Sequence, residues 1–350
     1  MNDSMKRFKS LNIIFGWVAF VIATVTYLLT LEPTASFWDC GEFISTAYKL
    51  DVGHPPGAPF FMLTARFFTL FTSDPTRVAV MVNTLSGLCS GLTILFLFWT
   101  ITHLARKIVI KSDEDYTTGN IIIILGAGLL GALAYAFSDT FWFSAVEGEV
   151  YAYSSLFTAV VFWLILKWEE TADEPGSDRW LLLIAYLMGL SIGVHLLNLL
   201  AIPAIVLVYY FKKFTPSFKG VLLALLGSVV ILAVVLYGII PGFVQVASWF
   251  ELLFVNQLGF AFNSGLFVYI ILSIAALTWA IYESYVNKNY FRIILSFLLA
   301  ITLVGIPFFG QHIVLGIILV AALSFYFYKW RDKVNVHWIH TSILMITLML

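Results

Sequence analysis

The sequence is poor in charged residues and in cysteine. Asp, Glu, Lys and Arg make up 11% of the 350 residues and hydrophobic residues 61%, whereas charged residues make up about 25% of an ordinary soluble domain. A soluble core of this length does not need so much apolar surface. The composition therefore predicts a polytopic integral membrane protein. The two cysteines, Cys40 and Cys89, exclude a disulfide framework and a cysteine metal site.

Several enzyme signatures are also missing. The chain has no glycine-rich phosphate loop after a strand, no His-Glu-x-x-His motif and no internal repeat. Gly126, Gly128 and Gly131 are closely spaced, but they fall inside an apolar run, where small residues let membrane helices approach each other. We interpret these glycines as a packing device and not as a dinucleotide fingerprint.

Long apolar runs dominate the rest of the sequence and predict an all-α, polytopic transmembrane helical bundle of about ten to eleven spans. The first run, 11–31, follows Lys6, Arg7 and Lys9 and has no small-residue cleavage site, which favours a retained span over a cleaved signal peptide. The further runs are 78–104, 120–138, 150–167, 180–195, 197–211, 220–240, 265–284, 292–308, 312–328 and one that begins at Trp338 and is cut at Leu350. We therefore expect residues 1–350 to form a single transmembrane module, the N-terminal part of a longer protein.

The basic residues predict the topology. Residues 181–211 can form one long helix or a hairpin that turns near His195–Asn198. With the hairpin, 16 of the 19 Lys and Arg residues fall on the cytoplasmic side with the N-terminus; with one long helix the split is 8 against 11. The positive-inside rule favours the hairpin. The outer side then contains the loop 32–77, the short turn 139–149, the turn at 195–198, the loop 241–264 and residues 310–312.

The outer loop 32–77 is the most polar part of the chain. Ser36, with Asp39 three residues on, is typical of a helix N-terminus, and we expect a helix from there to about Leu50. A turn at 54–57 follows. The segment 59–71 is apolar but too short to span, so we expect a helix that lies in the outer membrane interface.

Asp39 and Glu42 are the strongest catalytic candidates, because three-residue spacing puts both carboxylates on one helix face. Such a pair is expected to raise its proton affinity, and one member then suits a general base. In the alternative interpretation, Asp39 only caps the helix and Glu42 only pairs with Lys49.

Six further residues are candidates for binding the substrates of a transfer reaction, namely the phosphate of a donor or the hydroxyl of an acceptor. His54 precedes a rigid Pro-Pro-Gly turn, and Arg66 suits a lipid-linked phosphate by bidentate hydrogen bonding, although simple snorkelling is the alternative. Glu147 and Glu149 form a second outer acidic pair, which otherwise caps a helix. His195 and Asn198 line a cavity or satisfy backbone groups at the hairpin turn. Two carboxylates near a phosphate are compatible with a divalent metal, but nothing in the sequence requires one, and no metal ligands are predicted.

A family resemblance rests on the block 36–70. Residues Trp38-Asp39-Cys40-Gly41-Glu42-Phe43, then Ala47-Tyr48-Lys49-Leu50 and His54-Pro55-Pro56-Gly57, resemble the bacterial domain-of-unknown-function family 2723, and its Bacteroidetes members look most similar. The pattern of that family reads Asp-x-Gly-Glu-Leu/Phe and then His-Pro-Pro-Gly. Its animal relative is a protein O-mannosyltransferase, and its clan is the GT-C glycosyltransferases, many-span enzymes whose first outer loop carries an acidic catalytic residue. Family members are longer than this chain, with further spans and a soluble C-terminal part.

The resemblance implies a membrane glycosyltransferase that moves a sugar, mannose in the first instance, from a polyprenyl-phosphate donor to Ser or Thr of extracytoplasmic proteins. It implies a lipid-linked sugar donor, a protein acceptor and membrane lipids as partners, with no nucleic acid. It also implies the bacterial inner membrane, with a cytoplasmic N-terminus and a periplasmic site. The alternatives are transfer to a lipid or surface glycan, a transporter or flippase, and a scaffold with an inactive site.

Overall fold

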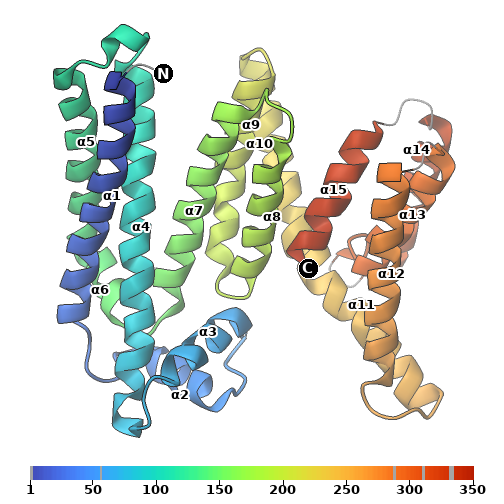
Figure 1. Ribbon diagram of the computed structural model, residues 1–350. Helices are drawn as coiled ribbons and strands as arrows, with labels where there is room; N and C mark the ends of the chain where they lie inside the picture. The colour runs from blue at the N-terminus through green and yellow to red at the C-terminus, as the bar shows by residue number, and fades with distance from the viewer. Residues whose placement is uncertain (1–2, 56, 287–288, 310–311, 331–334) are drawn as a thin grey trace. The chain divides into compact units, whose positions relative to one another are not determined.

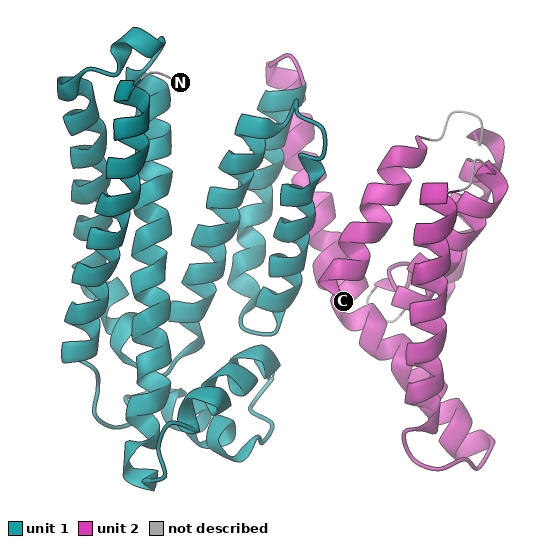
Figure 2. Ribbon diagram, viewed as in Figure 1, with its two compact units in different colours: residues 1–213 teal, residues 214–350 magenta. Residues whose placement is uncertain are grey.

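The computed structural model describes residues 3–55, 57–286, 289–309, 312–330 and 335–350, and this part of the chain contains helices and no strand. The all-α class is thereby confirmed. The chain forms two compact units, residues 1–213 and 214–350 (Figure 2). The single module of 1–350 stays a prediction.

Unit 1 is a helical bundle with short helices at its ends (Figure 1). Its elements are α1 (Asp3–Leu29), α2 (Cys40–Lys49), α3 (Pro59–Thr69), the 3-10 turn η1 (Pro75–Arg77), α4 (Val78–Val109), η2 (Asp113–Asp115), α5 (Thr118–Ala136), α6 (Asp139–Val146), α7 (Val150–Thr171), α8 (Asp178–Ile192), η3 (Leu196–Ala201) and α9 (Ile202–Lys213).

The centre of unit 1 is α4, which packs against α1, α5 and α7. Small residues allow this packing. A Cβ atom at Gly91 would overlap with Thr24 of α1, and one at Gly128 of α5 would lie 2.8 Å from Phe98 of α4. The packing role predicted for the α5 glycines is confirmed at Gly128 and Gly131, but a Cβ at Gly126 would meet nothing within 4 Å.

Unit 2 begins with a continuous helical segment, 218–257, and four further helices follow it among the described residues. Its elements are α10 (Phe218–Ala233), the π-helical turn η4 (Val234–Ile239), α11 (Ile240–Leu252), the π-helical turn η5 (Leu253–Gln257), α12 (Ser264–Val286), α13 (Tyr290–Val304), α14 (Ile313–Trp330) and α15 (Val336–Met349). Within this unit α12 packs against α11, α13 and α15.

Each of the eleven predicted apolar runs falls on a helix. Within the described residues, eight helical segments are long and apolar enough to cross a membrane, and α13 and α15 are shorter apolar helices. The chain is thus a polytopic integral membrane protein. The predicted hairpin is also confirmed as a break, because α8 ends at Ile192 and α9 starts at Ile202.

One predicted loop is wrong. Residues 241–264 were expected to be an outer loop, but helix continues to Gln257 and only 258–263 connect to α12. Pro241 lies in the first turn of α11, where its missing N–H is tolerated, and the π-helical turn η4 directly precedes it. A Pro-Gly signal that is typical of turns is therefore accommodated inside a helix.

The predicted outer elements of unit 1 lie at one end of that unit. These are α2, α3, α6 and the turn after α8, whereas η2 and the connection from α7 to α8 lie at the opposite end (Figure 1). The N–H of Phe60 in α3 donates to the carbonyl of Gly193 after α8 at 2.7 Å, which joins two of these elements. Which end faces the periplasm stays a prediction. Some residues used for the topology, namely Lys288, Gly310, Gln311, Arg331 and Lys333, lie outside the described residues, as does Pro56 of the predicted turn.

Candidate active site

The helix that carries the acidic motif begins later than predicted. α2 starts at Cys40, with Asp39 at its N-cap, whereas a start at Ser36 was expected. Trp38 has a φ of 60°, a left-handed conformation that ends any helix arriving from Ser36. The Asp39 side chain makes no capping hydrogen bond and is exposed, so it is available to a substrate.

Asp39, Glu42 and His54 form one polar cluster. The His54 ring places Nδ1 3.1 Å from Glu42 Oε2 and Nε2 3.9 Å from Asp39 Oδ2. The backbone N–H of His54 also donates to Glu42 Oε1 at 2.6 Å. The two carboxylates are therefore bridged by a histidine, and both oxygens of Glu42 face His54 and not Lys49.

The contacts with His54 reverse the expected effect on Glu42. The hydrogen bond from the His54 backbone N–H, followed by that from its ring, holds the pKa of Glu42 below its ordinary value. The expectation that this carboxylate gains proton affinity is wrong for Glu42, because its hydrogen-bond donors outweigh the loss of hydration. Glu42 therefore stays ionised, and it is suited to orienting the His54 side chain.

The local backbone explains how His54 reaches α2. Leu50 caps α2 with a φ of 53°, which turns the chain back at the end of the helix. Gly57 has a φ of 96°, and its N–H donates to the carbonyl of His54 at 2.9 Å. The His54 ring also packs on Phe43, with 5.9 Å between ring centroids. The turn predicted at 54–57 is thus the element that fixes the histidine.

The ligand atoms of Asp39, Glu42 and His54 lie within 4.8 Å of one another, close enough for one metal ion. However, the donor set does not fit a preformed site, because His54 occupies both oxygens of Glu42 and directs Nδ1 at that carboxylate. A metal would have to break this network. We derive no step through a metal.

A second, buried acidic pair lies behind this cluster. Glu147 and Glu149 are each only 5% exposed. The thiol of Cys40 in α2 donates to both carboxylates, with Sγ 3.6 Å from Glu147 Oε2 and 3.9 Å from Glu149 Oε1. Sequence analysis gave Cys40 no role, and its position directly after Asp39 was the only available signal.

Burial dominates the proton affinity of this pair. Loss of hydration raises the pKa of Glu149 to about 7, with a further contribution from the negative charges of Glu147 and Asp39. Burial also raises the pKa of Glu147 and that of the Cys40 thiol, which therefore stays protonated as a donor. The pair therefore favours a bound proton close to Asp39. The binding of donor or acceptor by Glu147 and Glu149 stays a prediction.

Arg66 stabilises the end of α2. Its Nη1 donates to the carbonyl of Tyr48 at 2.7 Å, and its guanidinium stacks 5.3 Å from the centre of the Tyr48 ring. This contact satisfies a carbonyl at the helix C-terminus. Phosphate binding by Arg66 stays a prediction that has to use its other N–H groups.

The two hairpin residues also have structural partners. Asn198 is fully buried, donates to Ser191 Oγ at 2.8 Å and accepts from Thr158 Oγ1 at 3.1 Å, so it joins α8, η3 and α7. His195 accepts the N–H of Leu197 and packs on Tyr151, with 5.3 Å between ring centroids. Of the two residues, His195 has the link to the buried acidic pair: its ring contacts Tyr151, which is two residues after Glu149.

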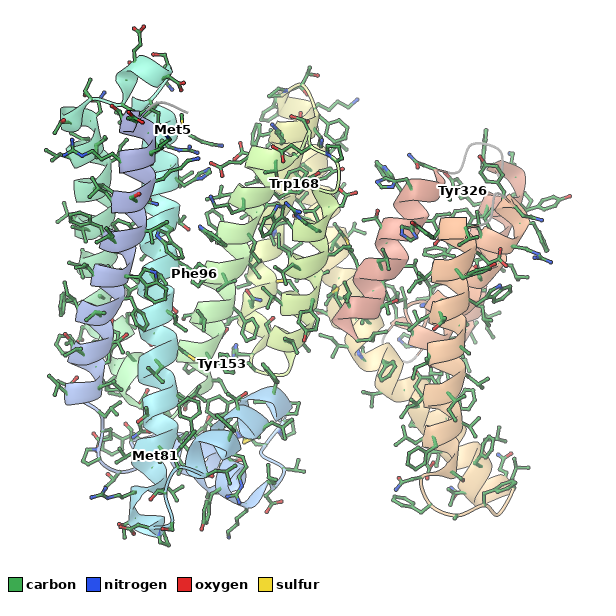
Figure 3. All side chains as sticks on the ribbon, viewed as in Figure 1. Met5, Met81, Phe96, Tyr153, Trp168 and Tyr326 are labelled. Atoms are coloured by element: carbon green, nitrogen blue, oxygen red, sulfur yellow. The ribbon has the colours of Figure 1, made fainter. Side chains whose placement is uncertain are left out.

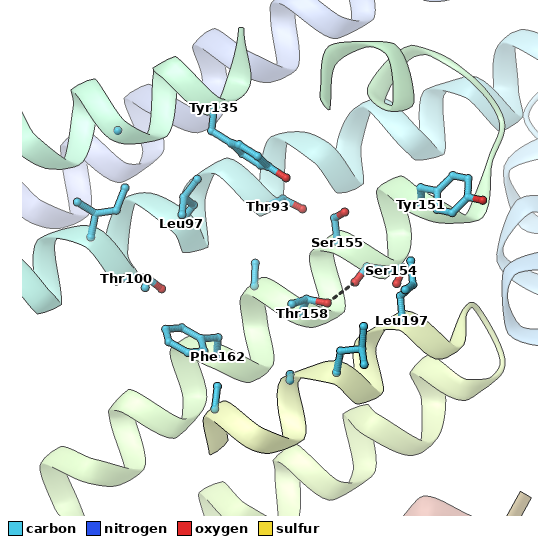
Figure 4. A pocket seen from close by; sticks show the side chains of 16 residues that line it. Thr93, Leu97, Thr100, Tyr135, Tyr151, Ser154, Ser155, Thr158, Phe162 and Leu197 are labelled. Atoms are coloured by element: carbon cyan, nitrogen blue, oxygen red, sulfur yellow. Dashed lines mark hydrogen bonds between the residues drawn. The ribbon is translucent and has the colours of Figure 1, made fainter. Parts of the chain in front are cut away.

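A cavity of about 730 Å³ opens beside this end of α7 (Figure 4). Apolar side chains such as Leu97, Phe162 and Leu200 line it, together with hydroxyl groups of Tyr135 and Tyr151. Tyr151 brings one end of the cavity to within two residues of Glu149. Sequence analysis did not find this cavity, because α4, α5, α7 and η3 contribute to it from distant parts of the chain.

The fold and the site together define a class: an all-α polytopic membrane protein with an Asp–Glu–His cluster on α2 and its flanking residues, at one end of its N-terminal unit. The family model described as the protein O-mannosyl-transferase TMEM260 N-terminal domain matches residues 39–217. Because this match covers half of the chain, the chain belongs to that family.

Two curated relatives show the extent of the similarity. The protein O-mannosyl-transferase TMEM260 of Mus musculus is 29% identical over 174 residues, which is 49% of this chain and 22% of the mouse protein. Protein O-mannosyl-transferase tmem260 of Dictyostelium discoideum is 26% identical over 199 residues, 55% of this chain and 22% of that protein. The chain thus spans about a fifth of the length of these relatives. The matched segment 39–217 contains all eight candidate site residues.

Proposed function

We propose that this chain is the membrane module of a GT-C-type protein O-mannosyltransferase. It transfers mannose from a polyprenyl-phosphate donor to a Ser or Thr hydroxyl of an extracytoplasmic protein. Membership in the TMEM260 family supports the reaction class. The observation that carries the site assignment is the exposed Asp39 carboxylate, which makes no capping hydrogen bond and lies 3.9 Å from His54 Nε2.

In the proposed step, Asp39 accepts the proton of the acceptor hydroxyl while that oxygen attacks the anomeric carbon of the donor. The bond from this carbon to the phosphate oxygen breaks, and the polyprenyl phosphate leaves with the electron pair. Attack from the side opposite to the leaving group inverts the anomeric centre. Since a hydroxyl is a poor nucleophile, the base is the group whose loss lowers the rate most.

Glu42 and His54 form the second part of the mechanism. The distance of 3.9 Å between His54 Nε2 and Asp39 Oδ2 is too long for a direct hydrogen bond, so each of the two atoms is available to its own substrate atom. Glu42 holds the ring through Nδ1 and the backbone through its N–H. Such a fixed imidazole is suited to stabilising the charge that develops on the leaving phosphate.

The cavity of Figure 4 supports a lipid-linked donor. Its apolar walls suit an isoprenoid chain, and Tyr151 at one end of it is two residues from Glu149 of the buried acidic pair. The exposed apolar side chains Leu63, Phe67 and Phe71 of the segment 59–71 support the expectation that α3 lies in the membrane interface. The bacterial inner membrane, the cytoplasmic N-terminus, the periplasmic site and the relation to family 2723 belong to the same proposal.

The test uses membranes that contain the chain, a radiolabelled mannosyl polyprenyl phosphate and a Ser/Thr-rich acceptor peptide. Label in the peptide that is released by β-elimination supports the proposal. Label that appears only in lipid or glycan fractions contradicts it in favour of the other glycosyltransferase reaction. Uptake of soluble sugar into proteoliposomes without any transfer contradicts it in favour of transport.

A further inference from the structure

A second cavity, of about 640 Å³, lies at the end of unit 1 that is remote from Asp39. α1 and α7 both pack against α4, and the cavity is lined by residues of all three helices. Its floor is aromatic: Trp163 of α7 lies 5.8 Å from Trp99 and 5.3 Å from Phe96 of α4, between ring centroids. Figure 3 shows Phe96 between these two helices. The proposed transfer reaction leaves this cavity without a role.

The charges in the cavity wall are both positive and negative. Lys9, Arg106 and Lys167 line it together with Glu170 and Glu174. Glu170 accepts from Arg106 and from Lys167, the latter at 3.1 Å, so one carboxylate is shared by two cations. Because several donors compete for few acceptors here, a phosphate finds cationic donors already in place.

Two acceptor atoms in the same wall lack a donor. His103 directs Nδ1 at Glu170 Oε1, 3.5 Å away, which assigns the proton to Nδ1 and leaves Nε2 as an acceptor. His103 Nε2 and Asn12 Oδ1 are buried and have no hydrogen-bond partner among the residues that the structure describes. Buried polar atoms are nearly always paired, so these two acceptors suit a ligand that carries N–H or O–H donors.

The cavity also reaches the lipid-facing surface. Ile13, one of its lining residues, is 53% exposed on the apolar side of α1, and Trp17 is exposed one turn further along. Basic pockets between the ends of transmembrane helices are suited to lipid headgroups. A ligand here is therefore expected to carry acyl chains.

We propose that this cavity binds phosphatidylethanolamine. Its phosphate contacts Lys167, Arg106 and Lys9, its ammonium group supplies donors to Asn12 and His103 after a small rotation of these side chains, and its chains lie along Ile13 and the tryptophans. The mixture of three cations and two carboxylates fits a zwitterionic headgroup better than an anionic one. Phosphatidylcholine has the same charges and chains but no N–H donor, so it is a matched control ligand.

Native mass spectrometry of the purified chain, titrated with each lipid at identical acyl composition, tests the proposal. Two hydrogen bonds of ordinary strength predict about 30-fold tighter binding of phosphatidylethanolamine than of phosphatidylcholine. Equal affinity for the two lipids, or tighter binding of phosphatidylglycerol than of phosphatidylethanolamine, would overturn the proposal. Competition by water-soluble glycerophosphoethanolamine at equal concentration would also overturn it, because the ligand would then not be a lipid.

Variants locate the site. Asn12→Leu and Lys167→Gln are expected to abolish the preference, whereas Asn12→Asp keeps an acceptor and retains it. Lys6→Gln removes the same charge from an exposed lysine that pairs with Asp3 on α1, and it serves as the control. Circular dichroism and the Tm show whether each variant is folded. If Lys167→Gln does not fold, the comparison of Asn12→Leu with Asn12→Asp still tests the proposal. If Asn12→Leu still prefers phosphatidylethanolamine to phosphatidylcholine, the two buried acceptor atoms do not bind the headgroup, and the proposal is contradicted.

Discussion

Glu42 and His54 are joined at two points: the His54 backbone N–H donates to one carboxylate oxygen at 2.6 Å, and ring Nδ1 lies 3.1 Å from the other. A single carboxylate thus sets both the position of the turn and the orientation of the imidazole. Asp39 lies on the remaining side of the ring, and the cluster has one fixed pair and one available carboxylate.

This pair predicts a non-additive effect on activity. Glu42→Gln and His54→Ala should each lower kcat several-fold, and the double variant should lose little more than the worse single variant, because either change already frees the ring. Lys49→Gln is the control, since Lys49 pairs with neither residue in the structure. Steady-state transfer rates give the answer, and fully multiplicative losses would show that the two residues act independently.

The same contact has a predicted pH dependence. The pKa of Glu42 is lowered in the folded state, so its contribution to stability is present at neutral pH and is lost as the pH falls through that lowered pKa. The Tm of the wild type should therefore fall more steeply at acidic pH than that of Glu42→Gln. Parallel Tm profiles of the two proteins would contradict this assignment.

Glu149 should behave in the opposite way. Its pKa is raised by burial to about 7, so its contribution is fully present below the ordinary carboxyl range and is lost as the pH rises towards 7. Glu149→Gln, which keeps the shape without the charge, should raise the Tm at pH 8 and change it little at pH 4. Glu114→Gln, at an exposed site, provides the control. A Tm difference that does not depend on pH would contradict the burial argument.

The α5 glycines predict a contrast within one helix. An alanine at Gly128 would place Cβ 2.5 Å from Thr102 and 2.8 Å from Phe98, and overpacking of this kind costs about 1–3 kcal/mol. An alanine at Gly126 meets nothing within 4 Å and should stabilise the helix by about 0.5–1 kcal/mol through its better helix propensity. Unfolding of both variants in the same detergent measures the difference, and equal stabilities would contradict the close packing of α4 and α5.

The helices of this chain were predictable from the sequence because a bilayer imposes a local signal: each span must be a long apolar run. Pro241 shows the limit of local signals. A Pro-Gly pair predicts a turn, but the π-helical turn before it lets the helix continue to Gln257. Helix starts were also misjudged where backbone conformation decides, as at Trp38.

The site was only partly predictable. Asp39, Glu42 and His54 are close in sequence, and their cluster follows from one helix and one turn. The thiol of Cys40 contacts Glu147 across 107 residues, and Arg66 reaches the carbonyl of Tyr48 through tertiary packing of α2 on α3. No rule of residue spacing predicts these contacts, because they depend on how helices separated in sequence pack together.

Asp39→Asn, compared with Asp51→Asn, tests the central claim most directly. Both substitutions remove one carboxylate from the same loop, but Asp51 accepts the N–H of its neighbour Val52 and lies outside the cluster. In membranes supplied with labelled mannosyl polyprenyl phosphate and acceptor peptide, loss of a general base predicts that Asp39→Asn lowers transfer by about 10²–10⁴-fold. Asp51→Asn should retain wild-type transfer at equal protein level. Transfer by Asp39→Asn at the wild-type rate would contradict the account.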